Sequence, residues 1–370
     1  GSADVGDITL RNHHLRPFKT AVEAGVGTVM AAFSDVDGVP MHSLHHLLRE
    51  VLKEEWGFDG VVVADWDGVG ELVAHGVAGD LREAARLAIE AGVDVDMVSG
   101  AYHAHLASLV EEGTVRRDLV RDAARRVLRL KFRLGLFDAD CPTLPGGGHR
   151  EGSAALGIDR PLADRAAAAS FVVLKDEGVL PLTLPVAPEL PLLLTGAFSH
   201  EQLGLLGTWV LDGDPSAVST IAPALRSALN ADPGSPGEDR LVIDPGAFPD
   251  RTLRLAREAG TTVALVGEHP YRSGEDSSTS TLELPPGQVE FLQALSLVAE
   301  RLVVVVFAGR ALALDAVLSC ADAVILAWHP GIEGGPALAS ALTGARATGG
   351  LLPVSLPRSA GHLPITHAER

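Results

Sequence analysis

The chain has 370 residues, which is enough for two domains with separate hydrophobic cores. Apolar residues make up 46% of it and aromatic residues only 4%, which suits an aliphatic α/β protein better than a β-sandwich. The 48 acidic residues against 30 Lys and Arg give a net charge of −18, which argues against nucleic acid or an anionic membrane as a partner, because both need a basic face. No apolar run approaches the roughly 20 residues of a membrane-spanning helix.

Residues 1–140 alternate between helical and strand-like patterns and are predicted to form a first domain. Apolar residues recur at helical spacing over 44–56, with Ser43 as a candidate N-cap. Asp80 and Glu83 form a possible capping box for a second helix. Three short apolar runs show no period-2 alternation and predict parallel strands buried on both faces. The runs cover 27–33, 60–64 and 93–98, and a last helix is predicted over 117–133.

A segment rich in Gly and Pro follows, and we expect residues 141–160 to form a linker. Residues 161–370 are predicted to form a second domain with a mostly parallel sheet, because strand candidates alternate with helical stretches. The strand candidates are 171–175, 191–196, 241–244, 261–267, 301–307 and 322–328, and the helical stretches include 217–229, 284–300 and 331–343.

Three strand–helix units are too few to close a (β/α)8 barrel, which takes about 200–250 residues. The first domain is therefore either a smaller open sheet or the C-terminal part of a larger structure. We interpret the initial Gly1-Ser2 as a processing or cloning scar, so a secreted, periplasmic or cytoplasmic location all stay open.

Asp65 follows the apolar run Val61-Val62-Val63 directly before a turn. In parallel α/β proteins the working residues lie at the C-terminal ends of strands. The alternative is a structural role, as an Asx turn or a helix N-cap. Trp66 favours function, because an indole at a loop tip packs or stacks against a ligand, and sugars bind to aromatic platforms.

A second acidic site is the segment GEHPYRSGEDSSTSTLELP at 267–285, which follows the strand candidate 261–267. It carries Glu268, Glu275 and Asp276, and a Gly/Ser/Thr-rich loop of this length after a buried strand is uncommon without a function. The alternative is a solvated, mobile loop. Two carboxylates on strand-end loops of different domains are what a glycosidase needs, one as nucleophile and one as proton donor.

Several longer stretches together resemble glycoside hydrolase family 3, of the β-glucosidase type. In the first domain these are AGVGTVMAAFSDVDGVPMHS, LLREVLKEEWGFDGVVVADWDGV, AGVDVDMVSGAY and RVLRLKFRLGLFD. In the second they are SFVVLKDEGVLPL, LLGTWVLDGD, VGEHPYRSGEDSS, VVVVFAGRALAL, AWHPGIEGG and LPVSLPRSAGHLPI. The resemblance covers nearly the whole chain.

The resemblance implies the C-terminal part of a (β/α)8 TIM-type barrel followed by an α/β sandwich domain. It also implies a retaining, exo-acting β-glycosidase, most simply a β-glucosidase that acts on terminal non-reducing β-D-glucosyl residues by double displacement. Asp65 matches the nucleophile of the S-D-W motif (here A-D-W), and Glu275 matches the acid/base glutamate of S-G-E. Trp66 and Phe33 match aromatic residues that line the sugar site.

The chain departs from the family pattern in two places. About five barrel strands, with the residues that bind the sugar hydroxyls, lie upstream of the matching region in the family, so a complementary chain or self-association would have to complete the barrel. In the S-G-E loop, Thr279 and Thr281 stand where relatives often have Arg and Asp, which removes a cation near Glu275.

Other functions are less well supported by the sequence. The paired histidines, such as His13-His14 and His45-His46, do not share a helix face, and no H-E-x-x-H occurs, so no metal or cofactor is expected. No G-x-G-x-x-G or Walker A motif supports nucleotide binding. The remaining alternatives are a non-catalytic sugar-binding or structural fragment, or specificity for β-xylosides or β-N-acetylglucosaminides.

Overall fold

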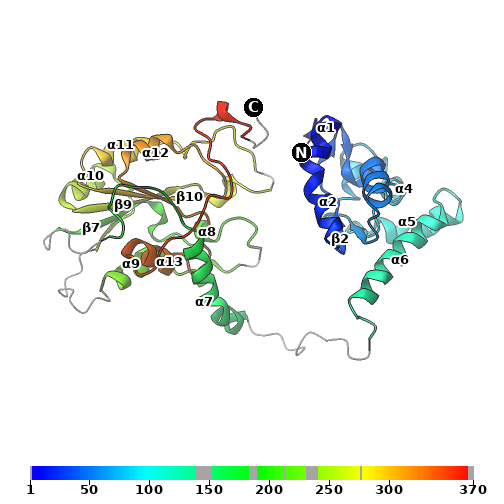
Figure 1. Cartoon of the computed structure of the whole chain (residues 1–370), viewed down its shortest axis with the longest axis horizontal. Helices are drawn as coiled ribbons and strands as arrows, with labels where there is room; N and C mark the ends of the chain where they lie inside the picture. The colour runs from blue at the N-terminus through cyan, green and yellow to red at the C-terminus, as the bar shows by residue number, and fades with distance from the viewer. Residues whose placement is uncertain are drawn as a thin grey trace. The chain divides into compact units, whose positions relative to one another are not determined.

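The computed structural model describes residues 2–138, 152–182, 190–211, 213–230, 241–275 and 277–365. The chain divides into two compact units, Gly1–Gly147 and Gly148–Arg370. Figure 1 shows the elements of both units along the chain. Within the described residues, no helix has the length and apolar character needed to cross a membrane.

The first unit is built around two parallel strands, β2 (Thr28–Met30) and β5 (Val61–Val63). Val95 adds a single parallel bridge to Val63, so the predicted third strand is reduced to one residue pair. A small second sheet has the order β1-β3-β4 (Ser2–Ala3, Asp35–Val36, Val39–Pro40). The strands predicted around 28–30 and 61–63 are confirmed.

Helical segments surround these strands, and apolar side chains from several of them form the core of the unit. They are α1 (Asp7–Thr9), η1 (Leu10–His14), α2 (Leu15–Glu23), η2 (Met41–Ser43), η3 (His46–Glu55), α3 (Glu71–Ala74), α4 (Leu81–Ala91), α5 (Ala101–Glu111) and α6 (Arg117–Arg133). The core joins Val62 of β5 to Leu48 and Leu52 of η3 and to Ala88 and Ile89 of α4.

Two local predictions are changed by the structure. Ser43 does not cap the helix after it, because the chain makes a 3₁₀ turn there and the Ser43 hydroxyl donates to the Pro40 carbonyl. The helix begins instead at His46. Strand β2 is not buried on both faces: Met30 is 55% exposed, since in the described part of the chain β2 pairs only with β5.

The capping interaction of α4 is confirmed with a small shift. The Glu83 N–H donates to Asp80 Oδ1 at 2.8 Å, and Glu83 Oε2 accepts from the N–H of Gly79, one residue before the cap. Gly92 ends the helix in a left-handed conformation (φ 111°).

A buried ion pair contacts Val62, the middle residue of β5. Lys53 Nζ is 2.6 Å from Asp94 Oδ1, and both side chains are only 2% exposed. Asp94 Oδ2 also accepts the N–H of Val62 at 2.8 Å, so the pair ties η3 to the central strand. Burial lowers the pKa of Lys53 to about 8, although the nearby Asp94 carboxylate acts to raise it.

The second unit is a six-stranded sheet with the order β6-β11-β10-β9-β7-β8. Its strands are β6 (Val172–Asp176), β7 (Leu192–Thr195), β8 (Leu241–Asp244), β9 (Thr261–Gly267), β10 (Leu302–Phe307) and β11 (Ala323–Leu326). Only β6 runs antiparallel to its neighbour. All six predicted strands and the mostly parallel sheet are therefore confirmed.

Helices cover both faces of this sheet (Figure 1). Val303 and Val305 of β10 pack with α7 (Gly152–Ser170), α9 (Ile221–Asn230) and α13 (Gly334–Thr343). Val304 and Val306 face α10 (Pro249–Glu258), α11 (Gln288–Ser296) and α12 (Asp315–Cys320) on the other side. The shorter segments are η4 (Ala197–Ser199), α8 (Leu203–Leu206), η5 (Pro215–Ala217), η6 (Pro270–Arg272) and η7 (Ala360–His362).

The predicted linker 141–160 lies partly outside the described residues. Helix α7 starts at Gly152, so positions 152–160 are helical.

Candidate active site

Asp65 lies two residues beyond the end of β5, where the chain leaves the sheet. The N–H of Ala64 still donates to the Val95 carbonyl, and the N–H of Asp67 donates to that of Met97, so the turn is held to the neighbouring segment. Asp67 takes a left-handed conformation (φ 54°), which turns the chain sharply after Trp66. The strand end thus presents two side chains in succession: Asp65 is half-buried and Trp66 is 65% exposed.

The Asp65 carboxylate is oriented by its own turn. Its Oδ1 accepts the N–H of Trp66 at 2.7 Å. The Asp65 N–H donates to Nε2 of His42 at 3.1 Å. Both backbone groups on either side of the Asp65 side chain are therefore fixed by hydrogen bonds.

Phe33 follows β2 and lies at the same end of the β2–β5 sheet as Asp65. Met30 pairs with Val63 in the parallel register of β2 and β5, so the residues that follow the two strands emerge together. The Phe33 ring lies 6.3 Å from the ring of His42, tilted by 46°. The structure therefore brings three of the predicted site residues, Asp65, Trp66 and Phe33, around one strand end, with His42 between Phe33 and Asp65.

Glu275 belongs to the second unit, in the loop between β9 and α11. It is exposed and follows Gly274, which takes a left-handed conformation (φ 97°) close to Thr208. The adjacent Trp209 is 67% exposed. Asp276, the other acid of this turn, lies outside the described residues.

Glu268, the first acid of the same loop, has a different environment. Its side chain is 1% exposed and both of its carboxylate oxygens are bound by Arg310, from Nε at 2.9 Å and from Nη2 at 2.7 Å. Arg272 Nε adds a third hydrogen bond, at 3.2 Å. A carboxylate enclosed by two guanidinium groups has no free oxygen to exchange a proton with a substrate, so Glu268 is a structural residue of the loop.

The two arginines also reach the far part of the loop. Arg310 Nη1 donates to the Thr281 carbonyl at 2.8 Å, and Arg272 Nη2 lies 3.4 Å from the Thr279 hydroxyl. The Ser277 hydroxyl donates to the Tyr271 carbonyl at 3.0 Å. Arg272 thus brings a cation to Thr279, one of the positions at which the sequence lacks the family's charged residues.

Two of these arrangements could not be found from the sequence. His42 and Asp65 are 23 positions apart, and Glu268 and Arg310 are 42 apart, so both contacts depend on which strands are neighbours. The only sequence signals were the buried acid directly after β9 and the Gly309-Arg310 pair after β10.

Within the described ranges, no group of three or more His, Cys, Asp or Glu side chains is arranged to hold a metal ion.

The comparisons with known proteins confirm the family resemblance. Residues 2–130 match the glycosyl hydrolase family 3 N terminal domain, and residues 171–370 match the glycosyl hydrolase family 3 C-terminal domain. The chain is 32% identical to the periplasmic beta-glucosidase of Salmonella typhimurium and 31% identical to a beta-xylosidase of Formosa agariphila. Each alignment covers 100% of this chain, but only 51% and 53% of those relatives.

A solved structure agrees with these matches. The beta-glucosidase from Listeria innocua, in complex with isofagomine, has a TM-score of 0.85 at 29% identity, over 99% of this chain and 50% of that one. The same enzyme has been solved with glucose, and a mutant of it with laminaribiose. The chain thus spans about half the length of the relatives that it matches, and it belongs to glycoside hydrolase family 3.

Proposed function

We propose that this chain carries both catalytic carboxylates of a retaining, exo-acting β-glucosidase. Asp65 is the nucleophile and Glu275 the acid/base, while Trp66 and Phe33 line the sugar subsite. The observation that carries the proposal is the end of β5, where a half-buried carboxylate oriented by the Trp66 N–H stands beside an exposed indole. Family membership and the beta-glucosidases among the relatives support it.

The reaction then follows double displacement. Glu275, exposed on its loop, protonates the glycosidic oxygen while an Asp65 oxygen attacks the anomeric carbon and forms a glycosyl ester. Glu275 next removes a proton from water, which cleaves the ester and releases the sugar with its original anomeric configuration. The proposal requires the two carboxyl groups to come within about 5–5.5 Å of each other in the working enzyme.

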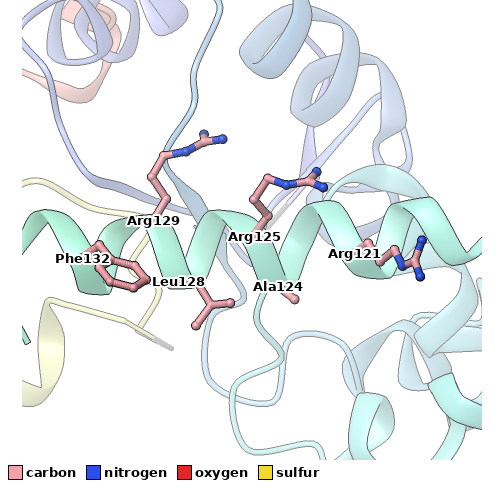
Figure 2. A pocket seen from close by; sticks show the side chains of 6 residues that line it. All are labelled: Arg121, Ala124, Arg125, Leu128, Arg129 and Phe132. Atoms are coloured by element: carbon pink, nitrogen blue, oxygen red, sulfur yellow. The ribbon is translucent and has the colours of Figure 1, made fainter. Parts of the chain in front are cut away.

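We further propose that unit 1 is the C-terminal part of a (β/α)8 barrel and that a complementary segment completes it. The relatives are about twice as long as this chain, and two features of the structure add support. Strand β2 leaves Met30 exposed, and the outer face of α6 carries Leu128 (48% exposed) and Phe132 (65%). Figure 2 shows these two in a row with Ala124 along α6, beside Arg121, Arg125 and Arg129, and the six residues line one shallow pocket.

The experiment measures release of p-nitrophenol from a panel of β-glycosides, by the chain alone and mixed with a barrel half that supplies the remaining strands. Preferred cleavage of the β-glucoside is expected. A preference for the β-xyloside would assign the specificity of the Formosa relative instead. An inactive but folded mixture would favour a sugar-binding or structural fragment.

The nucleophile is tested by Asp65→Asn and by trapping with a 2-deoxy-2-fluoro-β-glucoside. The variant is expected to lose nearly all turnover, and the trapped sugar to appear on the peptide that contains Asp65. Near-normal turnover of Asp65→Asn, or a label on another carboxylate, would show that the nucleophile is assigned wrongly.

A further inference from the structure

His42 lies directly behind the turn that carries Asp65. It belongs to the 3₁₀ turn η2 and is only 2% exposed. Its Nε2 is 3.1 Å from the backbone nitrogen of Asp65. A backbone N–H can only donate, so Nε2 must be the nitrogen without a proton, and the ring is the neutral tautomer with its hydrogen on Nδ1.

The imidazole is also fixed by its packing. Gly68 faces the ring so closely that a Cβ at this position would overlap Cε1 and Nε2 of His42. Phe33 bounds another side, at 6.3 Å between ring centroids. The ring therefore lacks the room to turn away from the Asp65 N–H without moving the Asp65–Gly68 turn itself.

We propose that His42 is a positioning residue for Asp65: its neutral ring holds the Asp65 main chain so that the carboxylate projects from the end of β5, and its protonation releases that hold. This inference rests on the proposed role of Asp65 as nucleophile. His42 touches neither substrate nor reacting atoms, and acts through the Asp65 backbone.

Protonation would oppose the contact on chemical grounds. An imidazolium carries hydrogens on both nitrogens, so Nε2–H would face the Asp65 N–H, donor against donor. The cost would be the lost hydrogen bond together with an unpaired buried donor. The turn would have to shift away, and the carboxylate would shift with it.

The charged groups around His42 do not reverse this preference. Asp65 and Asp96 favour the imidazolium, while His75 and above all burial favour the neutral ring, so the pKa of His42 lies below its usual value. Asp67, in the same turn, directs its carboxylate toward Gly70.

The charges on α4, which packs against η2, are already engaged. Arg86 pairs with Glu83 and Glu90, and Arg82 pairs with Glu112 on α5. At neutral pH the ring is therefore held without charge.

The first test is direct and needs no activity. Selective ¹⁵N labelling of histidine in the full-length protein reports the protonation of each ring nitrogen. At pH 7, His42 Nε2 is expected to show the shift of an unprotonated nitrogen, and the Asp65 amide to titrate together with it as the pH falls. A protonated Nε2 at pH 7 would overturn the proposal, whatever the role of Asp65.

The second test separates positioning from simple folding. His42→Phe removes the acceptor but keeps a ring, and His42→Gln retains an acceptor oxygen. We expect His42→Phe to lower kcat about 10- to 100-fold with little change in KM, since a shift near 1 Å costs about that much. We expect His42→Gln to recover most of kcat without the acid limb that His42 titration imposes on the pH profile. His103→Phe, at an exposed position on α5, is the control and should leave both unchanged.

Failure of this inference can be told from failure of the proposed function. If Asp65→Asn is inactive but His42→Phe keeps the normal kcat and pH profile, the nucleophile stands and His42 does not position it. If Asp65→Asn keeps normal turnover, the proposed function fails, while the tautomer measurement still reports whether the His42–Asp65 bond exists. If His42→Phe does not fold, the pH profile of His42→Gln and the tautomer decide.

Discussion

The guanidinium of Arg310 binds both carboxylate oxygens of Glu268, and through them it joins two neighbouring strands. Glu268 directly follows β9, and Arg310 lies three residues beyond β10, which pairs with β9 in parallel. With Arg272 as a second donor, the pair forms the base of the loop that carries Glu275. The position of an exposed carboxylate thus depends on a buried ion pair seven residues away.

Removing Arg310 is expected to destabilise the second unit strongly. In Arg310→Met the carboxylate of Glu268, 1% exposed, loses its main partner, and leaving such a charge buried costs about 3–5 kcal/mol of unfolding free energy. Urea denaturation followed by circular dichroism measures this. The loosened loop should also be cut faster by trypsin after Arg272.

Arg133→Met is the matched control, because the pair of Arg133 with Asp59 is exposed and should contribute at most about 1 kcal/mol. Equal losses in the two variants would mean that Glu268 tolerates the change by relaxation of the loop.

The two glutamates of the loop are expected to behave differently as variants. Glu275→Ala should lower turnover of an unactivated β-glucoside about 10²- to 10⁴-fold, the usual contribution of a general acid. Azide should restore turnover of an activated substrate and yield β-glucosyl azide. Glu268→Ala should instead lower stability, with no rescue by azide.

Glu290→Ala, at an exposed position on α11, controls for changes in surface charge. Rescue by azide in Glu268→Ala, and none in Glu275→Ala, would exchange the roles of the two residues.

The strands of the second unit could be predicted from sequence because each is a run of apolar, largely β-branched residues. Such a run is stable only when both faces are covered, as Val303 to Val306 show by facing two helical layers in turn. The same rule failed for β2, whose apolar run has a partner on one side only within the described residues.

The part of the candidate site that lies close to strand ends could be predicted from the sequence. Asp65, Trp66 and Phe33 lie two or three residues beyond the ends of β5 and β2, so their places depend on short segments of sequence. His42 and Arg310 act through tertiary contacts with residues 23 and 42 positions away, which short segments of sequence do not determine. His42 lies in a turn that periodicity cannot distinguish from the start of the next helix, which also explains why the sequence predicts Ser43 as a cap.

Removing only one partner of the Lys53–Asp94 pair should lower the unfolding free energy of the first unit strongly. In Lys53→Met the Asp94 carboxylate stays 2% exposed without its cation, and the first unit should lose about 3–5 kcal/mol of unfolding free energy. Adding Asp94→Asn removes the unpaired charge but keeps an oxygen to accept the Val62 N–H. The double variant should therefore recover much of the loss in urea denaturation.

The measured quantity is the coupling energy of the double-mutant cycle. Additive losses in the two single variants and the double variant would mean that the pair does not act as a unit.

The chain alone is expected to self-associate through the exposed apolar face of unit 1. Leu128→Ser with Phe132→Ser should reduce the apparent mass in light scattering, because these side chains line the shallow pocket on α6. Leu297→Ser, at a single exposed position of the second unit, is the control. A monomer with one sharp melting transition in the unmodified chain would contradict the expectation.

Burial of His42 should make the stability of the first unit depend on pH in a defined direction. The unfolded ring has a pKa near 6.5, and the folded ring has a lower one because burial disfavours the charged form. Between the two values the unfolded chain binds more protons, so stability is complete above about pH 6.5 and is lost as the pH falls toward the folded pKa. The unfolding free energy of the wild type minus that of His42→Phe should therefore fall as the pH is lowered from 7 to 5. His329 in the second unit is shifted in the same direction, and the subtraction removes its contribution because both proteins contain it. A difference that stays constant over this range would show that His42 gains its proton as readily in the folded protein as in the unfolded chain.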